Sequence, residues 1–345
     1  MGKGHSWSRF TAENLILGLA SLAFLITVSG SILYSLELSK KFDHLDEDDI
    51  VFVVPVGASF NLIKEILLES GVLKSSLFFS SASYLGKMTD RMQAGEYEVN
   101  AESSIRVLVR NLAVGNVRSL TLTLIEGWTF EKALSTIRSS EAIITSSVDF
   151  SVSGLGIGAK DYPTSTEGML FPDTYQYSAG TTDYEIISRA NTRLKDVLSS
   201  EWDKKTNDLP WKTPYDALII ASIIEKESGL INEKAEIAGV FARRIEKGMR
   251  LQSDPTVIYG LGDEYDGSLT RADLRHDTEF NSYTRNGLPP SPISLAGRES
   301  IRAALKPLSG ESLYFVADGL GGHVFTNTLN DHNREVKKFR EMSAQ

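Results

Sequence analysis

Residues 213–229 read TPYDALIIASIIEKESG, and this stretch predicts the central helix of a folded domain. Thr213 is a favourable N-cap, Pro214 suits the first helical position, and Asp216 places an acid in the first turn. Residues 218–224 come next, with apolar side chains on nearly every side of the helix. A helix without a polar face is normally buried, so we expect this one at the centre of the fold.

Two acids, Glu225 and Glu227, end this helix. Glu227 follows Ile224, Ile223 and Ile220 by three, four and seven residues and shares their face, whereas Glu225 lies about 200° of rotation away. A carboxyl at the rim of an apolar core has a raised pKa and donates a proton near neutral pH. We expect one acid to enter a cleft, although two acids that simply end a helix in water remain the alternative.

An uncharged segment at residues 14–36 is dense in Leu, Ile, Ala, Val and Phe. At 1.5 Å per residue it reaches about 34 Å, enough to cross a hydrocarbon core of ~30 Å. A cleaved signal peptide is the closest alternative because Ser29, Gly30 and Ser31 are small, but the apolar stretch is longer than such peptides usually have. A buried soluble helix would normally show a polar stripe, so we expect a retained transmembrane helix.

The charges on either side of this helix predict its orientation. Lys3 and Arg9 precede it, whereas five acids lie beyond its C-terminal end, within residues 43–49. The positive-inside rule therefore places residues 1–13 in the cytoplasm and the rest of the chain outside a plasma (inner) membrane, as a single-pass protein. We interpret residues 37–49 as a solvated acidic spacer.

The composition of the 345-residue chain, 41% hydrophobic and 23% charged, is that of a folded protein. The roughly 300 residues beyond the anchor suffice for one large domain or two smaller ones, and we expect two. The net charge of −9 argues against a nucleic-acid partner, which clustered Lys and Arg would bind. The absence of cysteine excludes disulfides and thiolate metal sites.

The extracytoplasmic part divides into a small module at residues 50–115 and a larger domain at residues 116–345. In the module we expect strands at residues 50–56 and 95–99 and helices at residues 59–71, 77–88 and 105–112. In the larger domain we expect a strand at residues 119–125, a helix capped by Thr129, a loop-rich segment at residues 143–165 and a helix at residues 183–200. The fold class is therefore α+β.

Several ordered motifs resemble the endolytic murein transglycosylase family, also called YceG-like. The runs that carry the resemblance are Ala94-Gly95-Glu96-Tyr97, Glu126-Gly127, Phe171-Pro172-Asp173-Thr174-Tyr175, Ala221-Ser222-Ile223-Ile224-Glu225-Lys226-Glu227, Gly248-Met249-Arg250-Leu251-Gln252-Ser253-Asp254-Pro255-Thr256-Val257-Ile258-Tyr259-Gly260, Arg271-Ala272-Asp273-Leu274, Gly287-Leu288-Pro289-Pro290 and Leu313-Tyr314-Phe315-Val316-Ala317-Asp318-Gly319. They span the soluble chain, and the resemblance includes the single anchor. One departure is Ser228, where relatives can carry Thr.

The resemblance implies a catalytic role for Glu227 and a LysM-like fold for the module at residues 50–115. It implies non-hydrolytic cleavage of the β-1,4 bond between N-acetylmuramic acid and N-acetylglucosamine within nascent peptidoglycan strands, which leaves a 1,6-anhydro end. It also implies partners in the wall-synthesis machinery, possible peptidoglycan synthases included. No cofactor is expected.

Amides and phenols bind sugar hydroxyl and N-acetyl groups, so we consider several such side chains as substrate contacts. The candidates are Gln252, Asp254, Tyr259, Asn281 and Tyr283, with Glu225 and Glu167 as weaker ones that more readily serve structure. For each of the first five singly, a role in a turn or in the core is an equal alternative.

Two other functions stay open at this point. A hydrolytic muramidase would use Asp254 as a second carboxylate. A non-catalytic glycan-binding scaffold would use only the LysM-like module. Metal catalysis is poorly supported, because His323, His332 and Asp331 form no known metal-binding spacing, and we expect no metal.

Overall fold

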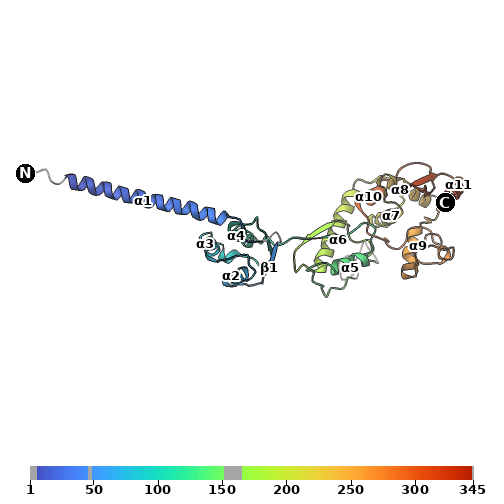
Figure 1. Cartoon of the computed structure of the whole chain (residues 1–345). Coiled ribbons are helices and arrows are strands. Elements are labelled where there is room, and N and C mark those ends of the chain that lie inside the picture. The colour runs from blue at the N-terminus through green and yellow to red at the C-terminus, as the bar shows by residue number, and fades with distance from the viewer. Residues whose placement is uncertain (1–5, 46–48, 151–164, 344–345) are drawn as a thin grey trace, which may run out of the picture. The chain divides into compact units, whose positions relative to one another are not determined.

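The computed structural model describes residues 6–45, 49–150 and 165–343, and it divides the chain into two compact units, Met1–Leu120 and Thr121–Gln345 (Figure 1). The fold is mixed α+β with one long apolar helix at the N-terminus, as the sequence predicts. Most of the loop-rich segment expected at residues 143–165, and three of the acids within residues 43–49, lie outside the described residues.

The first unit combines helices with one small sheet. Its elements are α1 (Ser6–Ser39), β1 (Ile50–Val54), α2 (Phe60–Glu69), α3 (Leu77–Leu85), the 3-10 turn η1 (Thr89–Arg91), β2 (Gly95–Val99) and α4 (Ile105–Val114). Strands β1 and β2 are antiparallel, with Ile50 opposite Val99, and Phe52 stacks on Tyr97 at 5.7 Å between ring centroids. Ser59 caps α2 by accepting a hydrogen bond from the amide of Leu62, as predicted.

Helix α1 extends beyond the span that the sequence suggested and joins the module directly. Its apolar part, Asn14–Ser39, is long enough to cross a membrane and is exposed throughout its apolar window. Leu38 and Phe42, which we assigned to a solvated spacer, are instead 8% and 5% exposed. The backbone amide of Phe42 donates to the carbonyl of Ser103 at 3.0 Å. These apolar side chains pack into the module although acids surround them in the sequence.

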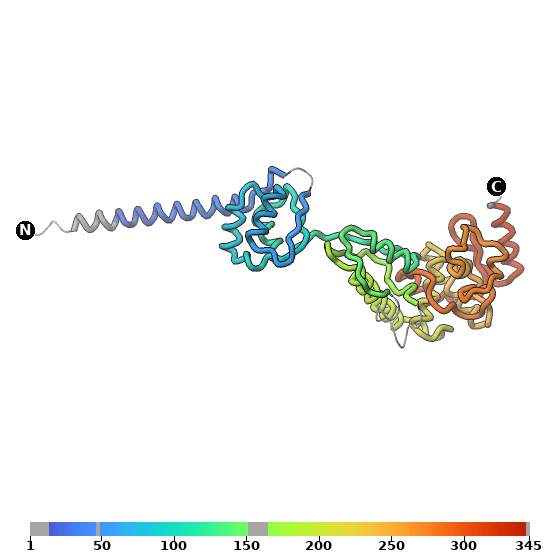
Figure 2. Tube along the Cα trace, turned by 90° about the horizontal axis from the view of Figure 1, so that it is seen from below, coloured from blue at the N-terminus to red at the C-terminus, as the bar shows by residue number. Residues whose placement is uncertain are grey.

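The second unit is mainly helical, with two small sheets. Its elements are β3 (Leu120–Thr123), α5 (Phe130–Arg138), β4 (Thr174–Tyr177), α6 (Asp183–Trp202), α7 (Pro214–Glu227), α8 (Ile231–Glu246), α9 (Asp254–Leu261), η2 (Gly262–Glu264), η3 (Asp273–Arg275), α10 (Arg298–Leu305), β5 (Tyr314–Ala317), β6 (His323–Thr326) and α11 (Leu329–Ser343). Strand β3 pairs with β4, and β5 forms an antiparallel hairpin with β6. Figure 2 follows the chain trace by colour, from blue at the N-terminus to red at the C-terminus.

Helix α7 lies at the centre of the second unit, as its sequence predicts. Residues 217–224 are all buried, and α7 packs against α6, α8, α9 and α10. The predicted cap is also present, because the amide of Asp216 donates to Thr213 Oγ1 at 3.1 Å and the amide of Thr213 donates to Asp216 Oδ2 at 3.0 Å. Burial on every side therefore positions the C-terminal end of α7.

The first acid of the helix end, Glu225, joins three elements in the core. It accepts hydrogen bonds from Lys234 Nζ of α8 at 2.7 Å, from Ser300 Oγ of α10 at 2.7 Å and from the amide of Gly297 at 2.9 Å. The side chains of Glu225 and Lys234 are 6% and 4% exposed. Because every one of these partners belongs to the core, Glu225 serves the packing of α7.

We predict that Lys234→Met destabilises the second unit by about 3–5 kcal/mol, because it leaves the Glu225 carboxylate buried without its cation. Denaturant unfolding of the full chain in detergent, followed through the transition of the second unit, measures this effect. Lys247→Met at the exposed end of the same helix is the matched control and should stay within about 0.5 kcal/mol of wild type. Equal midpoints for the two variants would contradict the assignment.

Candidate active site

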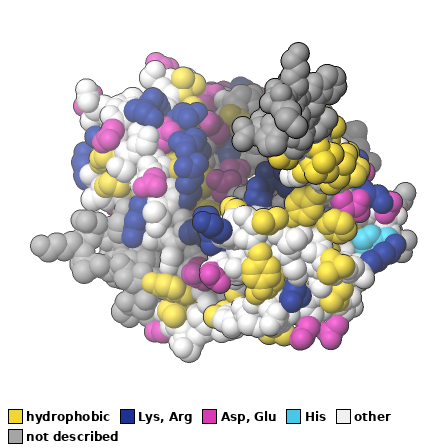
Figure 3. Space-filling view, turned by 90° about the vertical axis from the view of Figure 1, so that its left-hand side faces the viewer, with side chains coloured by type: hydrophobic (Ala, Val, Ile, Leu, Met, Phe, Trp, Pro, Cys, Tyr) yellow, Lys and Arg dark blue, Asp and Glu magenta, His cyan; other side chains and the backbone are white. Residues whose placement is uncertain are grey.

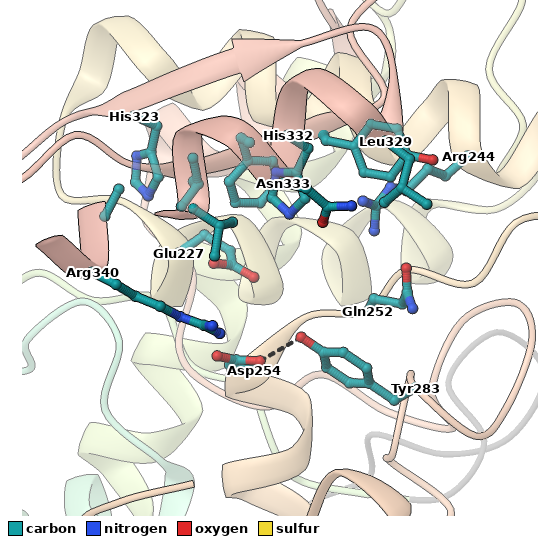
Figure 4. Close-up of a pocket in the computed structure, with 15 residues that line it drawn as sticks. Glu227, Arg244, Gln252, Asp254, Tyr283, His323, Leu329, His332, Asn333 and Arg340 are labelled. Carbon is teal, nitrogen blue, oxygen red and sulfur yellow. Dashed lines mark hydrogen bonds between the residues drawn. The ribbon is translucent and has the colours of Figure 1, made fainter. Parts of the chain in front are cut away.

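Glu227, the second acid of the helix end, lies at the edge of a cavity of about 570 Å³ (Figure 4). The helix stops here because Ser228 adopts an extended conformation. The cavity is lined by Glu227, Arg244, Gln252, Asp254, Tyr283, Tyr314, Phe315, Val316, Ala317, His323, Leu329, His332, Asn333, Val336 and Arg340. The two acids of one helix end therefore occupy different environments, as the helical rotation between them predicts.

Ser253 holds the Glu227 carboxyl in place. Its hydroxyl donates to Glu227 Oε1 at 2.5 Å, although Ser253 is the N-cap residue of α9 and would normally accept a bond from its own helix. A buried network orients Ser253 itself: its amide donates to Ser282 Oγ at 2.9 Å, and Thr256 Oγ1 donates to its carbonyl at 2.7 Å. The preceding residue, Gln252, has a φ of 51°, a left-handed conformation that is rare for a side chain of this size.

The environment of Glu227 favours its neutral form. Burial raises the pKa of Glu227 to about 7, and the negative charge of Asp254 acts in the same direction. The hydrogen bond from Ser253 and the positive charges of His323 and Arg244 act against this rise. A carboxyl with a pKa near 7 donates and accepts protons equally well at neutral pH, which is the property of a general acid that later serves as a base.

A carboxylate–imidazole pair forms another part of the wall. His323 Nδ1 lies 2.8 Å from Glu233 Oε2, and the amide of His323 donates to Glu233 Oε1 at 2.9 Å. Burial opposes the ionisation of Glu233, but the hydrogen bonds from His323 hold the pKa of Glu233 below its usual value. An ionised Glu233 takes the Nδ1 proton as its partner and leaves Nε2 as the second polar atom of the ring. Ser228 supports the pair by donating to Glu233 Oε2 at 3.1 Å.

Arg244 of α8 contributes a buried cation. Its Nε donates to the carbonyl of Leu313 at 2.7 Å and its Nη1 to the carbonyl of Leu251 at 2.5 Å. The guanidinium also lies over the ring of Tyr314, 5.2 Å from its centroid. Arg244 thus joins the hairpin and the loop before α9, and its charge lies close enough to Glu227 to affect the pKa of that carboxyl.

Helix α11 supplies one wall of the cavity from a single face. His332, Val336 and Arg340 follow one another at four-residue intervals, with Leu329 and Asn333 beside them. In Figure 4 the side chain of Arg340 extends toward the space between Glu227 and Asp254, and Asn333 lies beside His332. The C-terminal helix therefore brings polar groups to the site from far along the chain.

Three of the proposed sugar contacts, Gln252, Asp254 and Tyr283, lie in this cavity with Glu227. The hydroxyl of Tyr283 donates to Asp254 Oδ1 at 2.6 Å, the contact marked in Figure 4. The side chain of Gln252 is exposed to the cavity. These residues stay predictions as substrate contacts, and the geometry places them where such contacts would be made.

The other candidates lie elsewhere. Asn281 is 0% exposed, and its amide group donates to the carbonyls of Asp273, Leu274 and His276 within its own loop. Glu167 accepts hydrogen bonds from the amides of Phe130 and Gly168 at 2.9 and 3.0 Å and from the Tyr259 hydroxyl at 3.2 Å. Burial raises the pKa of Glu167. The side chains of Asn281, Glu167 and Tyr259 do not line the cavity.

The sequence analysis missed several residues of the site: Arg244, Tyr314, Asn333 and Arg340, which line the cavity, and Ser253, which donates to Glu227. The sequence contained evidence for Arg244. This residue follows Ile237 and Phe241 at helical spacing, so the pattern places a charged side chain on a buried face of the helix. The sequence contained no such evidence for the polar residues of α11, because a helix with many charged residues is usually exposed to solvent. His323 and His332 were considered only as metal ligands.

Within the described ranges, no cluster of three or more His, Cys, Asp or Glu residues could hold a metal ion. His323 pairs with Glu233, and Asp331 accepts from Thr328 and Arg334 at 2.7 Å. His332 stacks on Tyr314 at 5.3 Å. These residues are therefore parts of hydrogen-bonded or stacked pairs.

Fold and site together define a two-unit α+β protein with a long N-terminal apolar helix and a carboxyl of raised pKa at the edge of a cavity. The model of the YceG-like family matches residues 52–338. The chain is 30% identical over 336 residues to an endolytic murein transglycosylase of Bacillus subtilis, a match that covers 91% of each protein. The chain belongs to the YceG-like family.

Two further similarities each cover most of this chain. An endolytic murein transglycosylase of Streptococcus pneumoniae is 28% identical over 319 residues, which covers 82% of this chain and 57% of that relative. A solved structure of a YceG-like protein from Listeria monocytogenes is 27% identical, covers 84% of this chain and 99% of its own, and aligns with a TM-score of 0.49.

We predict that two neighbours of Glu227 shift its pKa in opposite directions. Ser253→Ala removes a donor to the carboxylate and should raise the pKa of Glu227 above about 7, whereas Asp254→Asn removes a nearby negative charge and should lower it. A ¹³C NMR titration of the glutamate carboxyls measures both shifts, with Glu227→Gln identifying the resonance. Asp263→Asn, an exposed acid outside the cavity, is the control. Shifts of the same sign in the two variants would refute this account.

The same pKa predicts how stability depends on pH. Because the folded-state pKa of Glu227 is raised to about 7, its contribution to stability is complete below the unfolded value and is lost as pH rises through 7. Glu227→Gln should therefore be more stable than wild type at pH 8, on the order of 3 kcal/mol, and should lose this advantage near pH 4. Unfolding midpoints measured at both pH values test this expectation.

Proposed function

We propose that the chain is a membrane-anchored lytic transglycosylase that cleaves peptidoglycan within its glycan strands. The observation that carries the proposal is the Glu227 carboxyl, with a pKa of about 7, in an open cavity lined by amide, phenol and imidazole groups. The family and the names of the relatives, endolytic murein transglycosylases, support the choice of substrate.

In the first step, neutral Glu227 protonates the glycosidic oxygen that links C1 of N-acetylmuramic acid to C4 of N-acetylglucosamine. The C1–O bond breaks, the 4-hydroxyl of N-acetylglucosamine leaves, and the muramyl N-acetyl group stabilises the positive charge at C1. The raised pKa of Glu227 is what makes this proton available near pH 7.

In the second step, the ionised Glu227 takes the proton from the 6-hydroxyl of the same muramyl residue while that oxygen attacks C1. The product is a 1,6-anhydro end, and Glu227 is again protonated, so no water is consumed. Because the nucleophile belongs to the substrate, its effective molarity replaces an activated water, and one carboxyl suffices. Ser253 supports both steps, since its hydroxyl keeps Glu227 Oε1 in one position.

Within this proposal, Gln252, Tyr283 and His323 are the substrate contacts that the cavity favours. Each presents a polar group beside Glu227, and His323 is oriented by Glu233. Asn281, Glu167 and Tyr259 then act through structure, since they hold the loops around the site by the contacts described above.

The proposal also covers the finer organisation of the chain. Residues 1–13 form the cytoplasmic tail, residues 14–36 the transmembrane segment, residues 50–115 a LysM-like module and residues 116–345 the catalytic domain, outside a plasma (inner) membrane. The apolar helix Asn14–Ser39 supports the anchor, and the charges on either side of it support the orientation. A catalytic domain held at that surface would act on nascent strands beside the peptidoglycan synthases.

One alternative has an observation in its favour. Asp254 lines the same cavity as Glu227, and a hydrolytic muramidase would use it as the second carboxylate. The hydrogen bond from Tyr283 to Asp254 at 2.6 Å gives this carboxylate another role, in fixing the Tyr283 ring. Product chemistry separates the two reactions.

We predict that the full chain in detergent converts defined glycan strands to products with 1,6-anhydro ends, and that digestion in H₂¹⁸O incorporates no ¹⁸O. Mass spectrometry of the products measures both outcomes. Glu227→Gln should reduce the rate by about 10²–10⁴-fold or to below detection, because it removes the proton donor. Glu279→Gln, an exposed acid outside the cavity, is the matched control and should leave the rate unchanged.

Three results would each overturn a different part of the proposal. Reducing ends that carry ¹⁸O would establish a hydrolase. Strands that bind the wild-type chain but are never cut would establish a non-catalytic scaffold. Full activity in a folded Glu227→Gln variant would remove Glu227 from the mechanism, whatever the product.

A further inference from the structure

We propose that helix α3 lies in the headgroup region of the membrane and docks the first unit on the bilayer surface from which α1 emerges. The inference rests on the proposed membrane anchor, and it assigns the apolar surface of α3 to lipid. The supporting observations concern the exposed face of α3, its contact with α1, and the depth at which that contact lies.

The exposed residues of α3 are unusually apolar. Leu77, Leu85 and Tyr84 are 76%, 74% and 62% exposed, and Phe78 is 38% exposed. Phe78, Tyr84 and Leu85 follow Leu77 by one, seven and eight residues, so all four lie on one face of the helix. Phe79 lies on the opposite face and is buried in the module. A cluster of large apolar side chains on one helical face marks an interaction surface.

This face contacts α1. The hydroxyl of Tyr34 in α1 donates to Ser81 Oγ at 3.0 Å, and the Tyr34 ring lies 6.2 Å from the ring of Phe78. Because Leu38 and Phe42 are buried in the module as well, no solvated linker separates α1 from the first unit. The module therefore begins where the apolar helix ends.

The position of Tyr34 along α1 sets the depth of α3. Tyr34 follows Asn14, the first residue of the apolar span, by twenty positions, which corresponds to about 30 Å of helix and to the thickness of the hydrocarbon core. With Asn14 at the inner boundary, Tyr34 lies at the outer boundary, where tyrosine is favoured. Ser81 and Phe78, which contact Tyr34, lie at the same depth.

The charges around α3 suit this location. Leu77–Leu85 contains no charged residue, and Lys74 and Lys87 flank it on either side. Arg106 of α4 reaches the same end of α1, where its guanidinium donates to Ser35 Oγ at 2.9 Å and to Ser39 Oγ at 3.2 Å. An apolar helical face between cations is the pattern of helices that lie in an interface containing anionic lipids.

Figure 3 looks at the molecule from the side on which α1 extends. Hydrophobic side chains are drawn in yellow in this view, and the exposed ones of α3 are Leu77, Phe78, Tyr84 and Leu85. Because Tyr34 of α1 contacts Ser81 and Phe78, a membrane crossed by α1 would lie beside α3. Lipid is therefore the occupant that the contact between α1 and α3 favours over a protein partner.

Single cysteines test the proposal cleanly, because the chain contains no cysteine of its own. We would label Leu77→Cys and Leu85→Cys with nitrobenzoxadiazole in the full chain, reconstituted in vesicles of phosphatidylethanolamine and phosphatidylglycerol. Leu25→Cys inside the span is the positive control, and Glu65→Cys on the exposed side of α2 is the negative control. Nitroxide lipids quench labels inside the bilayer, and iodide quenches labels in water.

We expect nitroxides near the headgroups to remove most of the emission at positions 77 and 85, and nitroxides at the bilayer centre to remove it at position 25. Position 65 should respond to iodide alone. Labels at 77 and 85 that behave like position 65, while position 25 is quenched by lipid, would overturn the docking of α3 and leave the anchor intact. Labels at 77 and 85 shielded from both quenchers would assign the face to a protein instead. Loss of lipid quenching at position 25 would overturn the anchor and the docking together.

Discussion

The burial of helix α7 is the constraint on which the rest of the second unit depends. Apolar residues surround this helix on every side, so its C-terminal end has a fixed position in the core. This end carries two glutamates whose side chains lie in different environments. Glu225 points into the core and is neutralised by Lys234, whereas Glu227 points into the cavity and has no cation bonded to it within the described residues. The rotation of the helix between them thus separates an acid held in the core from one that faces the cavity.

The surrounding loops adjust the position and the pKa of Glu227 at the end of α7. Ser253 gives its hydroxyl to Glu227 instead of to its own helix, so α9 begins without a side-chain cap. That hydrogen bond limits the rise in pKa that burial causes, and Asp254 acts in the opposite direction. The balance leaves the pKa of Glu227 at about 7, a value that suits a group required to give and to recover a proton in one reaction cycle. Arg244 and the Glu233–His323 pair complete the polar surroundings with groups that are themselves held by hydrogen bonds.

The first unit depends on a different constraint, the continuity of α1 with the module. Tyr34, Leu38 and Phe42 lie on or just after α1 and pack against α3 and α4 or into the module's core. The apolar helix is therefore part of the folded unit. If α1 crosses a membrane, the position of the module relative to that membrane would follow from the position of α1.

Much of the local structure was predictable, because it depends on interactions between residues close in the sequence. The capped start of α7, the strand Gly95–Val99 and the burial of residues 218–224 all follow from short-range patterns of polar and apolar residues. The helical rotation between Glu225 and Glu227 was also enough to predict that their side chains point in different directions. The site was predictable only in part. Gln252, Asp254 and Tyr283 line the same cavity as Glu227. Asn281 is buried instead, because its side-chain amide donates to three carbonyls of its own loop.

The sequence by itself determined the long apolar N-terminal helix, the buried helix and the acid at its end, because each rests on periodicity or length within one segment. Only the tertiary structure decided that Ser253 bonds Glu227, that Glu233 orients His323 and that α11 brings Asn333 and Arg340 to the same cavity. These contacts join segments far apart along the chain, and no local pattern of side chains encodes which distant partner each one meets. The packing around α7 makes that choice, because it fixes the direction in which every neighbouring element presents its side chains.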